Sequence, residues 1–244
     1  MSSAKPHPLW EELQTIILEM EPEIRALRRY LHQNPEPSNE EFQTTTKVAE
    51  ILNEAGVHTQ IAPTGRGLLA NSAFQGGPQR IALRADMDAL RIQDEKTVEY
   101  RSTKPNLMHA CGHDAHTAML TGTVKALAEL ERRYPDKVTW RAIFQPAEET
   151  ASGALEMIGW GAMENVDAIV GLHVDPLFPV GQITSRPGPL SAICEEIELT
   201  VLGRGGHGAR PQQTIDPIAI GTELISRIYK EVPQTFHKSP QAAR

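Results

Sequence analysis

Three short apolar segments each lead into polar residues that could carry chemistry. The segments are 80–85, 138–144 and 166–172, and helical patterns alternate with them. Short apolar runs of this kind are typical of strands, so the order predicts an α/β fold. In such folds ligands bind where the carboxyl ends of the strands meet. The nearly continuous apolar run at 166–172 also predicts a fully buried strand.

The residues that follow these segments are candidates for that edge of the sheet. Asp86 and Asp88 follow the first segment, Glu148 and Glu149 the second, and His173 the third. All are side chains that bind metals or move protons. We therefore expect a shared site at the strand ends.

The N-terminal part predicts helices. Apolar residues recur at helical spacing over 9–32, and Pro22 predicts a break into two helices. Ser38, with Glu41 three positions on, predicts a capping box for a helix that ends at Gly56. Four residues of this helix are expected to face inward: Phe42, Val48, Ile51 and Leu52.

Hydrophobic patterns predict two strands and two helices in the middle of the chain. The segments 67–74 and 80–85 predict two strands that could form a hairpin. A helix is expected after His113 and a short one at 153–161.

The chain changes character near residue 180, where proline and glycine predict a linker. Beyond it, 197–201 alternates as a half-buried strand does, and Asp216 with Pro217 predicts the capped start of a helix. One strand and one helix make too little core to stand alone. We expect an α/β domain at 1–183 and the first part of a smaller domain at 184–244.

The stretch from His109 to His116 holds the highest concentration of potential metal ligands. This stretch reads His-Ala-Cys-Gly-His-Asp-Ala-His and offers a thiol, imidazoles and a carboxylate, the ligands of zinc and its first-row neighbours. Cys111 and His113 are two apart, so on an extended strand end they point the same way and could grip one ion. The alternative is a buried apolar Cys111 and a helix-capping His113. Glu149 and His173, each at another strand end, favour the metal site.

The pair Glu148-Glu149 has two interpretations. Adjacent acids are often only a solvated charge pair. Here a strand and Pro146 lead into them, so one could bind metal while its neighbour takes a proton from water.

Other residues allow both a structural and a functional interpretation. His109 and His116 are expected to be structural or to support a ligand. Asp86 and Asp88 could bind metal directly or orient its histidines, and Asp114 could do the same or cap a helix. His207 sits among glycines, where it could be a turn residue or a donor to a substrate carbonyl.

Composition narrows the class of protein. A net charge of -7 without a basic stripe argues against a nucleic-acid partner. Two cysteines make no disulfide framework, and Cys194 is expected to be an inert strand or core residue. The N-terminus lacks the apolar run of a signal peptide, and no stretch is long enough to span a membrane. We expect a cytoplasmic protein.

The sequence resembles the metal-dependent amidohydrolases that include hippurate hydrolase, N-acyl-amino-acid amidohydrolases and plant indole-acetyl-amino-acid hydrolases. The resemblance rests on six blocks in the family's order: Leu31-His32 with Asn34-Pro35-Glu36, 84–90, 108–116, 145–149, 171–174 and 205–211. It implies an aminopeptidase-like catalytic domain, with a mixed sheet between helices and two divalent metals, and a smaller α+β lid domain.

The resemblance also implies roles for single residues. Cys111, His113, Glu149 and His173 are implied metal ligands, and Glu148 is the implied general base and acid. His207 corresponds to the lid histidine, which in many relatives reaches the active site of a dimer partner. The wider family has a bridging carboxylate where this chain has Cys111, and a histidine where it has Asp86, which leaves the role of Asp86 open.

The resemblance implies that relatives continue for well over a hundred residues beyond the position of Arg244 and supply a last histidine ligand near their C-terminus. We therefore expect this chain to be a truncated form.

These features together predict hydrolysis of the amide bond of N-acyl amino acids with zinc, manganese, cobalt or nickel. A dipeptidase, a carbamoyl-amide hydrolase and an inactive, metal-binding truncated chain are the alternatives. A nucleoside deaminase-type zinc site is disfavoured, because its His-x-Glu and Pro-Cys-x-x-Cys motifs are absent.

Overall fold

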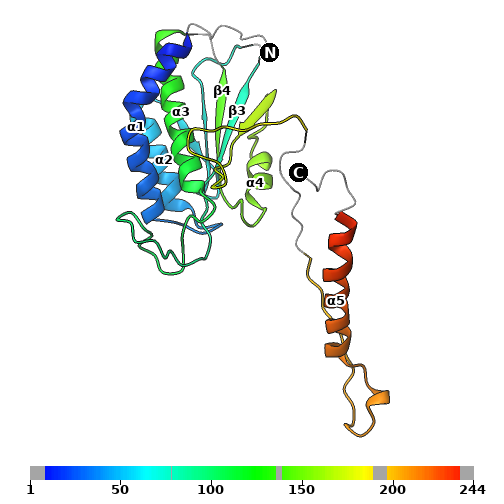
Figure 1. The fold of residues 1–244 in the computed structure, drawn as a ribbon. Helices are drawn as coiled ribbons and strands as arrows, with labels where there is room; N and C mark the ends of the chain where they lie inside the picture. The colour runs from blue at the N-terminus through cyan, green and yellow to red at the C-terminus, as the bar shows by residue number, and fades with distance from the viewer. Residues whose placement is uncertain (1–8, 78, 136–138, 189–196, 237–244) are drawn as a thin grey trace. The chain divides into compact units, whose positions relative to one another are not determined.

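The computed structural model describes residues 9–77, 79–135, 139–188 and 197–236. The chain divides into two units, Met1–Val180 and Gly181–Arg244, and each is described by itself (Figure 1). Cys194, expected to be a strand or core residue, lies outside the described residues.

The first unit is built on one mixed sheet of five strands. Its strands are β1 (Thr59–Ile61), β2 (Leu68–Asn71), β3 (Ile81–Asp86), β4 (Trp140–Gln145) and β5 (Ala168–Gly171). They lie in the order β1-β2-β4-β3-β5. β3 pairs in parallel with both β4 and β5, whereas β2 is antiparallel to its neighbours. This confirms the predicted α/β class with a mixed sheet.

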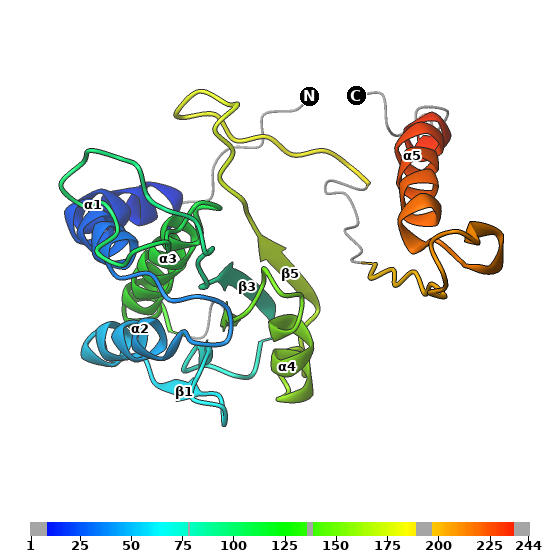
Figure 2. The ribbon, with the colours of Figure 1, turned by 90° about the horizontal axis from the view of Figure 1, so that it is seen from below.

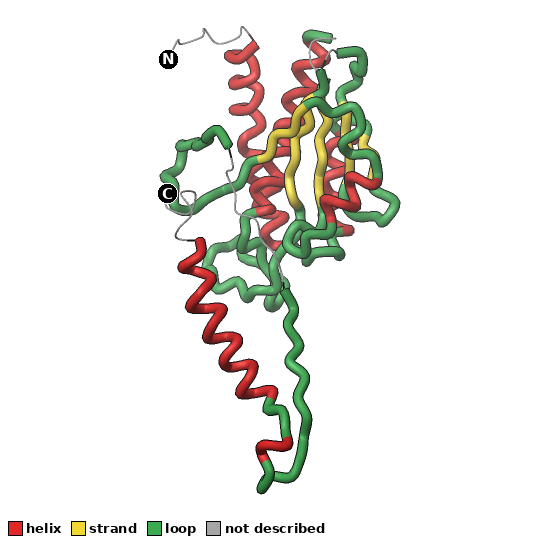
Figure 3. Tube along the Cα trace, turned by 90° about the vertical axis from the view of Figure 1, so that its right-hand side faces the viewer, coloured by secondary structure: helices red, strands yellow, loops and turns green. Residues whose placement is uncertain are grey.

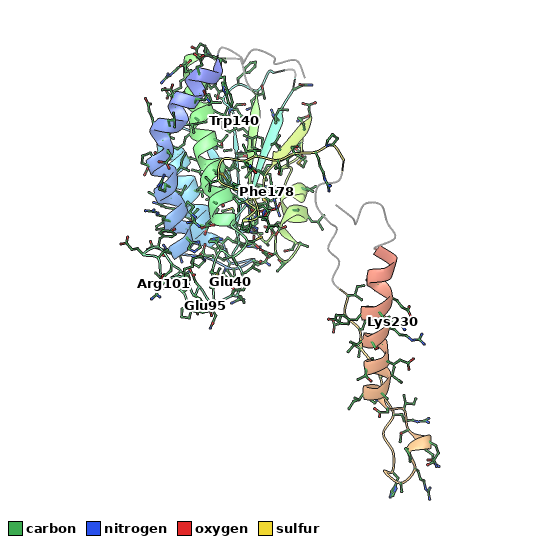
Figure 4. All side chains as sticks on the ribbon, in the orientation of Figure 1. Glu40, Glu95, Arg101, Trp140, Phe178 and Lys230 are labelled. Atoms are coloured by element: carbon green, nitrogen blue, oxygen red, sulfur yellow. The ribbon has the colours of Figure 1, made fainter. Side chains whose placement is uncertain are left out.

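Helices cover both faces of this sheet (Figures 1 and 2). The three long ones, on one face, are α1 (Leu9–Gln33), α2 (Phe42–Glu54) and α3 (His113–Arg133), and the short α4 (Gly153–Gly159) lies on the other. The main core packs α2 and α3 against the sheet and includes the buried Trp140 at the start of β4, labelled in Figure 4. A smaller core lies under α4 around Ile143 and Met157.

The suggested hairpin between the segments 67–74 and 80–85 is wrong. β4 lies between β2 and β3, and β2 pairs instead with β1. The parallel pairing of β3 with β4 requires a crossover connection, which α3 provides. Sequence proximity therefore misled the prediction of strand pairing here.

The predicted break at Pro22 is also wrong, because α1 continues through this residue. Helix α1 packs along α3, and Ile16 and Leu27 are buried on the two sides of the proline. We infer that this packing holds the helix together despite the hydrogen bond that a proline cannot make.

The start of α2 differs from the predicted capping box. The helix begins at Phe42, and Ser38 donates a hydrogen bond to Asp88 rather than to a helix amide. The carboxylate of Glu36 accepts the amides of Gln43 and Thr44 at 3.1 and 2.7 Å. A residue from the turn that precedes the helix thus caps it. Of the four residues expected to face inward, Val48 and Leu52 are fully buried, Ile51 is half-buried and Phe42 is exposed.

The fully buried strand expected at 166–172 is instead an exposed edge strand. β5 pairs with β3 on one side, and Ile169 and Val170 are about half exposed. Among the described residues, no further strand pairs with its outer edge. An apolar run alone does not distinguish a covered strand from an uncovered one.

The second unit contains the 3-10 turn η1 (Pro211–Gln213) and helix α5 (Pro217–Phe236), which is the longer of the two red helical segments in the lower part of Figure 3. Asp216 accepts the amides of Ile218 and Ala219, which confirms the predicted cap. The predicted strand at 197–201 is not formed, because no described segment pairs with it. No described helix is long and apolar enough to cross a membrane.

Candidate metal centre

The strand ends and the start of α3 bring most of the predicted residues together. β3 and β4 are in register as far as Asp86 opposite Gln145, so Asp86 and the Glu148-Glu149 pair leave the sheet at the same edge. His173 follows β5, and His113 is the first residue of α3. The fold thus gathers residues that are far apart in sequence.

His113 is the centre of this cluster. Its Nε2 lies 3.6 Å from Asp86 Oδ2, 3.9 Å from Glu148 Oε2 and 3.8 Å from Glu149 Oε1. Its other nitrogen, Nδ1, lies 3.0 Å from the carbonyl oxygen of Asp88. A carbonyl can only accept, so Nδ1 carries a proton, and in the neutral form of the ring the lone pair of Nε2 faces the acids.

The carboxylate of Asp88 fixes the orientation of His113 from the side opposite Nε2. This carboxylate lies 3.2 Å from His113 Nδ1, accepts the hydroxyl of Ser38 at 2.6 Å and accepts the amide of Glu149 at 3.0 Å. Burial opposes its ionisation, but these hydrogen bonds outweigh burial and lower the pKa of Asp88 to about 2. Asp88 is therefore a charged support that fixes both His113 and Glu149.

Cys111 and His173 form a second contact at the edge of the cluster. Cys111 Sγ, a free thiol, lies 3.3 Å from His173 Nε2. His173 Nδ1 donates to the carbonyl oxygen of Val174 at 2.7 Å, which leaves Nε2 as the lone-pair nitrogen facing sulfur.

His116 has both ring nitrogens bound by protein groups. The amide of Val174 donates to Nε2 at 2.9 Å, so Nδ1 carries the proton that it donates to Asp86 Oδ1 at 2.6 Å. The other oxygen of Asp86 accepts Arg84 Nη1 at 2.7 Å. His116 and Asp86 are thus bound to each other and to the scaffold.

The backbone before the acidic pair adopts an unusual conformation. Ala147 is fully buried at a φ of 50°, and its amide donates to Glu41 Oε1 at 2.7 Å. Residues other than glycine rarely adopt such backbone angles. Glu41 therefore anchors the turn that aims Glu148 and Glu149.

The cluster contains more carboxylates than positively charged groups, and this excess of negative charge shifts the pKa values of its members. Burial and the nearby Glu148 raise the pKa of Glu149. Burial alone would lower the pKa of His113, but its hydrogen bond to Asp88 and the surrounding carboxylates raise it. Burial and the same acids raise the pKa of the Cys111 thiol to about 12. A cation would relieve all three shifts.

The unpaired atoms of the cluster fit a metal ion. His113 Nε2 and Glu149 Oε1 are buried and have no hydrogen-bond partner. Ligand atoms around a tetrahedral ion with bonds of about 2.1 Å lie roughly 3.4 Å apart, close to the distances around His113. Three groups among the described residues could hold an ion, and His113 belongs to each: with Cys111 and His173, with Asp86 and His116, and with Glu148 and Glu149.

Three predicted candidates lie elsewhere. Asp114 binds α1, because its carboxylate accepts His32 Nδ1 at 2.7 Å and Arg28 Nε at 3.0 Å. His109 is buried with both nitrogens unpaired, and burial lowers its pKa to about 4. His207 lies in the second unit, is exposed there and accepts the amide of Ala209.

Four further residues support the site without a predicted role in it: Ser38, Glu41, Arg84 and Val174. Arg84 could have been found, since on a strand it shares a face with Asp86 two positions on. Ser38 and Glu41 fit a capping-box pattern instead, and nothing in the sequence marks the Val174 amide.

The sequence profile of Peptidase family M20/M25/M40 matches residues 82–242, about two thirds of the chain. The N-acyl-L-amino acid amidohydrolase of Geobacillus stearothermophilus is 40% identical over 220 residues, covering 89% of this chain and 59% of that protein. The chain spans about half to three fifths of the length of the curated relatives that it matches.

Two solved structures share the fold. The Bacillus subtilis YXEP protein, described as a dinuclear metal binding peptidase from M20 family, is 39% identical. It matches with a TM-score of 0.65 over 72% of this chain and 48% of its own. A putative aminohydrolase from methicillin resistant Staphylococcus aureus is 30% identical, with a TM-score of 0.77 over 95% of this chain and 61% of its own.

Proposed function

Because the chain belongs to Peptidase family M20/M25/M40, we propose that it carries the metal centre of a hydrolase that cleaves the amide bond of N-acyl amino acids. The observation that carries the proposal is the unpaired Nε2 of His113 among three carboxylates and beside a Cys–His pair. The names of the amidohydrolase relative and of the dinuclear peptidase support the substrate class and the metals.

The proposed ligands of two divalent metal ions are Cys111, His113, Glu149 and His173. Thiolate with imidazole favours zinc, whereas the carboxylate also suits manganese, cobalt or nickel. A divalent ion bound here would supply a water of lowered pKa and an electrophile for the acyl carbonyl. Asp88 binds Nδ1 of His113 and so keeps Nε2 directed at the proposed metal position.

Glu148 is the proposed general base and acid. Its side chain is 40% exposed, against 20% for Glu149, so it is the one with room to face a substrate. It takes the proton from the attacking water as oxygen bonds to the acyl carbon. It then protonates the amine as the C–N bond breaks, which releases a carboxylate and a free amino acid.

The second unit is proposed to serve as the first part of a lid. His207 would donate to the carbonyl oxygen of the substrate, and a second copy of the chain would pair with this unit as a homodimer. The thiol ligand suits a reducing compartment such as the cytoplasm.

The proposed mechanism predicts the behaviour of Glu148→Gln. General-base assistance contributes about 100- to 10,000-fold, so this variant should lose hydrolysis of N-acetyl and N-benzoyl amino acids by that factor. Its metal content, measured by elemental analysis, should stay at the wild-type value, since Glu148 is not a proposed ligand.

Glu40→Gln is the matched control, because Glu40 is an exposed acid of the same unit that pairs with Arg91. It should keep the wild-type rate. More than about a hundredth of that rate in Glu148→Gln would contradict the proposed role.

A further inference from the structure

A chain of hydrogen bonds links Asp86 to the segment that carries His173. Asp86 Oδ1 accepts His116 Nδ1 at 2.6 Å, and His116 Nε2 accepts the Val174 amide at 2.9 Å. The carbonyl oxygen of the same residue, Val174, accepts His173 Nδ1 at 2.7 Å. We propose that His116 is a positioning residue that aims His173 at the metal centre through the backbone of Val174.

The direction of each bond fixes the role of His116. A backbone amide can only donate, so the Val174 contact makes Nε2 an acceptor and puts the proton on Nδ1, where Asp86 receives it. Both nitrogens are then used within the protein. His116 is therefore not free to bind an ion, although it lies with Asp86 and His113 in one of the groups that could hold one.

The segment after β5 needs such a support. Ile169, Val170 and Leu172 are about half exposed, so core packing does not fix the path of the chain into His173. Among the described residues, two hydrogen bonds join 172–178 to the rest of the unit: one between the Cys111 thiol and His173 Nε2, and one from the Val174 amide to His116 Nε2. The bond to the buried His116 is the one that anchors the backbone.

A second contact secures the same residue. Gly112 has a φ of 90°, and a Cβ built on it would lie 2.3 Å from Val174 Cγ2. The side chain of Val174 thus occupies the space that a side chain at 112 would need. The amide of Val174 thus binds His116 in the first turn of α3, and its side chain packs at Gly112, directly before that helix. These two contacts fix Val174 and so place the preceding residue, His173, next to Cys111.

The inference rests on the proposed metal site, and two substitutions of His116 separate its two bonds. Asparagine places its polar atoms near the position of Nδ1 and can bind Asp86, but it is too short to reach Val174. Glutamine places them near the position of Nε2 and can still accept the Val174 amide. Thr121→Val is the matched control, since Thr121 is equally buried in α3 and loses one hydrogen bond, to the carbonyl of Thr117.

The experiment titrates the full chain with Co²⁺ and detects binding by the absorption of cobalt bound to thiolate and imidazole. Groups that orient metal ligands typically contribute about 10- to 100-fold in metal affinity. His116→Asn should therefore bind Co²⁺ about 10- to 100-fold more weakly with a changed spectrum. His116→Gln and Thr121→Val should stay close to wild type.

Equal affinity and spectrum in wild type and His116→Asn would overturn the inference. Equal losses in the Asn, Gln and Thr121→Val variants would also overturn it, because they would show a general effect on stability.

Absence of cobalt binding in wild type would contradict the proposed metal site instead. Hydrogen exchange of the Val174 amide then decides on His116: protection in wild type and in His116→Gln, but not in His116→Asn, supports the positioning role. Equal exchange in all three overturns it.

Discussion

At the scale of single residues, the site depends on which atom of each histidine carries a proton. His113 and His173 both donate through Nδ1 to a carbonyl oxygen, of Asp88 and Val174 respectively, and so present Nε2. His116 presents no free nitrogen. Their hydrogen bonds give two of the three histidines the form of a metal ligand and the third the form of a support.

Gly112 is the residue where backbone and packing are most demanding. Gly112→Ala must accept a φ of 90° and a Cβ 2.3 Å from Val174. Strain of this kind costs about 1–3 kcal/mol, so we expect the free energy of unfolding to fall by about that amount and cobalt affinity to fall with it. Urea unfolding measures the first effect and cobalt titration the second.

Gly159→Ala is the control for this prediction. A Cβ at Gly159 meets nothing within 4 Å, and its φ is not positive. The stability of this variant should stay the same or rise slightly. An unchanged stability in Gly112→Ala would show that Val174 moves aside freely and does not hold His173.

At the scale of elements, the sequence predicted the parts whose residues carry local signals. The strands before Asp86 and Glu148, the helix after His113 and the cap at Asp216 all form as expected. The pairing of β2 with β4, the continuity of α1 through Pro22 and the exposure of β5 were not predicted. Each of these depends on neighbours that are distant in sequence, which periodicity cannot report.

The same limit applies to the site. Strand ends predicted which acids and histidines would gather, because parallel strands share an edge. The hydrogen bonds of Ser38 to Asp88 and of Glu41 to Ala147 come from the segment before α2, over 50 and 106 residues of sequence. No spacing pattern connects these positions, so their support of the site became visible only in the fold.

The buried carboxylate of Asp94 binds several groups of the loop 93–106, which Glu95 and Arg101 mark in Figure 4. Asp94 accepts the amides of Ser102 and Lys96 at 2.9 and 3.0 Å. It also lies 3.3 Å from both Lys96 Nζ and His32 Nε2. Burial raises its pKa, but the bonds from Ser102 and Lys96 outweigh burial and lower it from 3.8 to about 2.

This shift predicts a difference in acid stability. Because the pKa is lower in the folded state, the stabilisation is complete above pH 4 and is lost as pH falls from 3.8 to about 2. At about 1.4 kcal/mol per pH unit it amounts to roughly 2 kcal/mol. Asp94→Asn should be less stable than wild type by about this amount at pH 7, and the gap should close toward pH 2.

Urea unfolding at pH 7, 4, 3 and 2 measures this gap. Glu95→Gln changes the neighbouring exposed acid and controls for the loss of charge alone. A gap that stays constant between pH 4 and 2 would show that the ionised Asp94 does not stabilise the loop.

At the scale of the whole molecule, the chain comprises an α/β unit that holds the metal cluster and a second unit with little core of its own. In the second unit Ile218, Ile225 and Tyr229 of α5 are largely exposed. The chain spans about half to three fifths of the length of the curated relatives that it matches. The cluster around His113, by contrast, is assembled within the first unit alone.

Metal content tests the central claim most directly, and His113 is the residue to change because it belongs to every candidate group of ligands. We expect elemental analysis of the chain purified without chelator to show about two divalent ions per folded molecule. His113→Ala should lose them while its far-UV circular dichroism stays that of a folded protein. A wild-type chain without metal, or a folded His113→Ala with the wild-type content, would contradict the proposed metal centre.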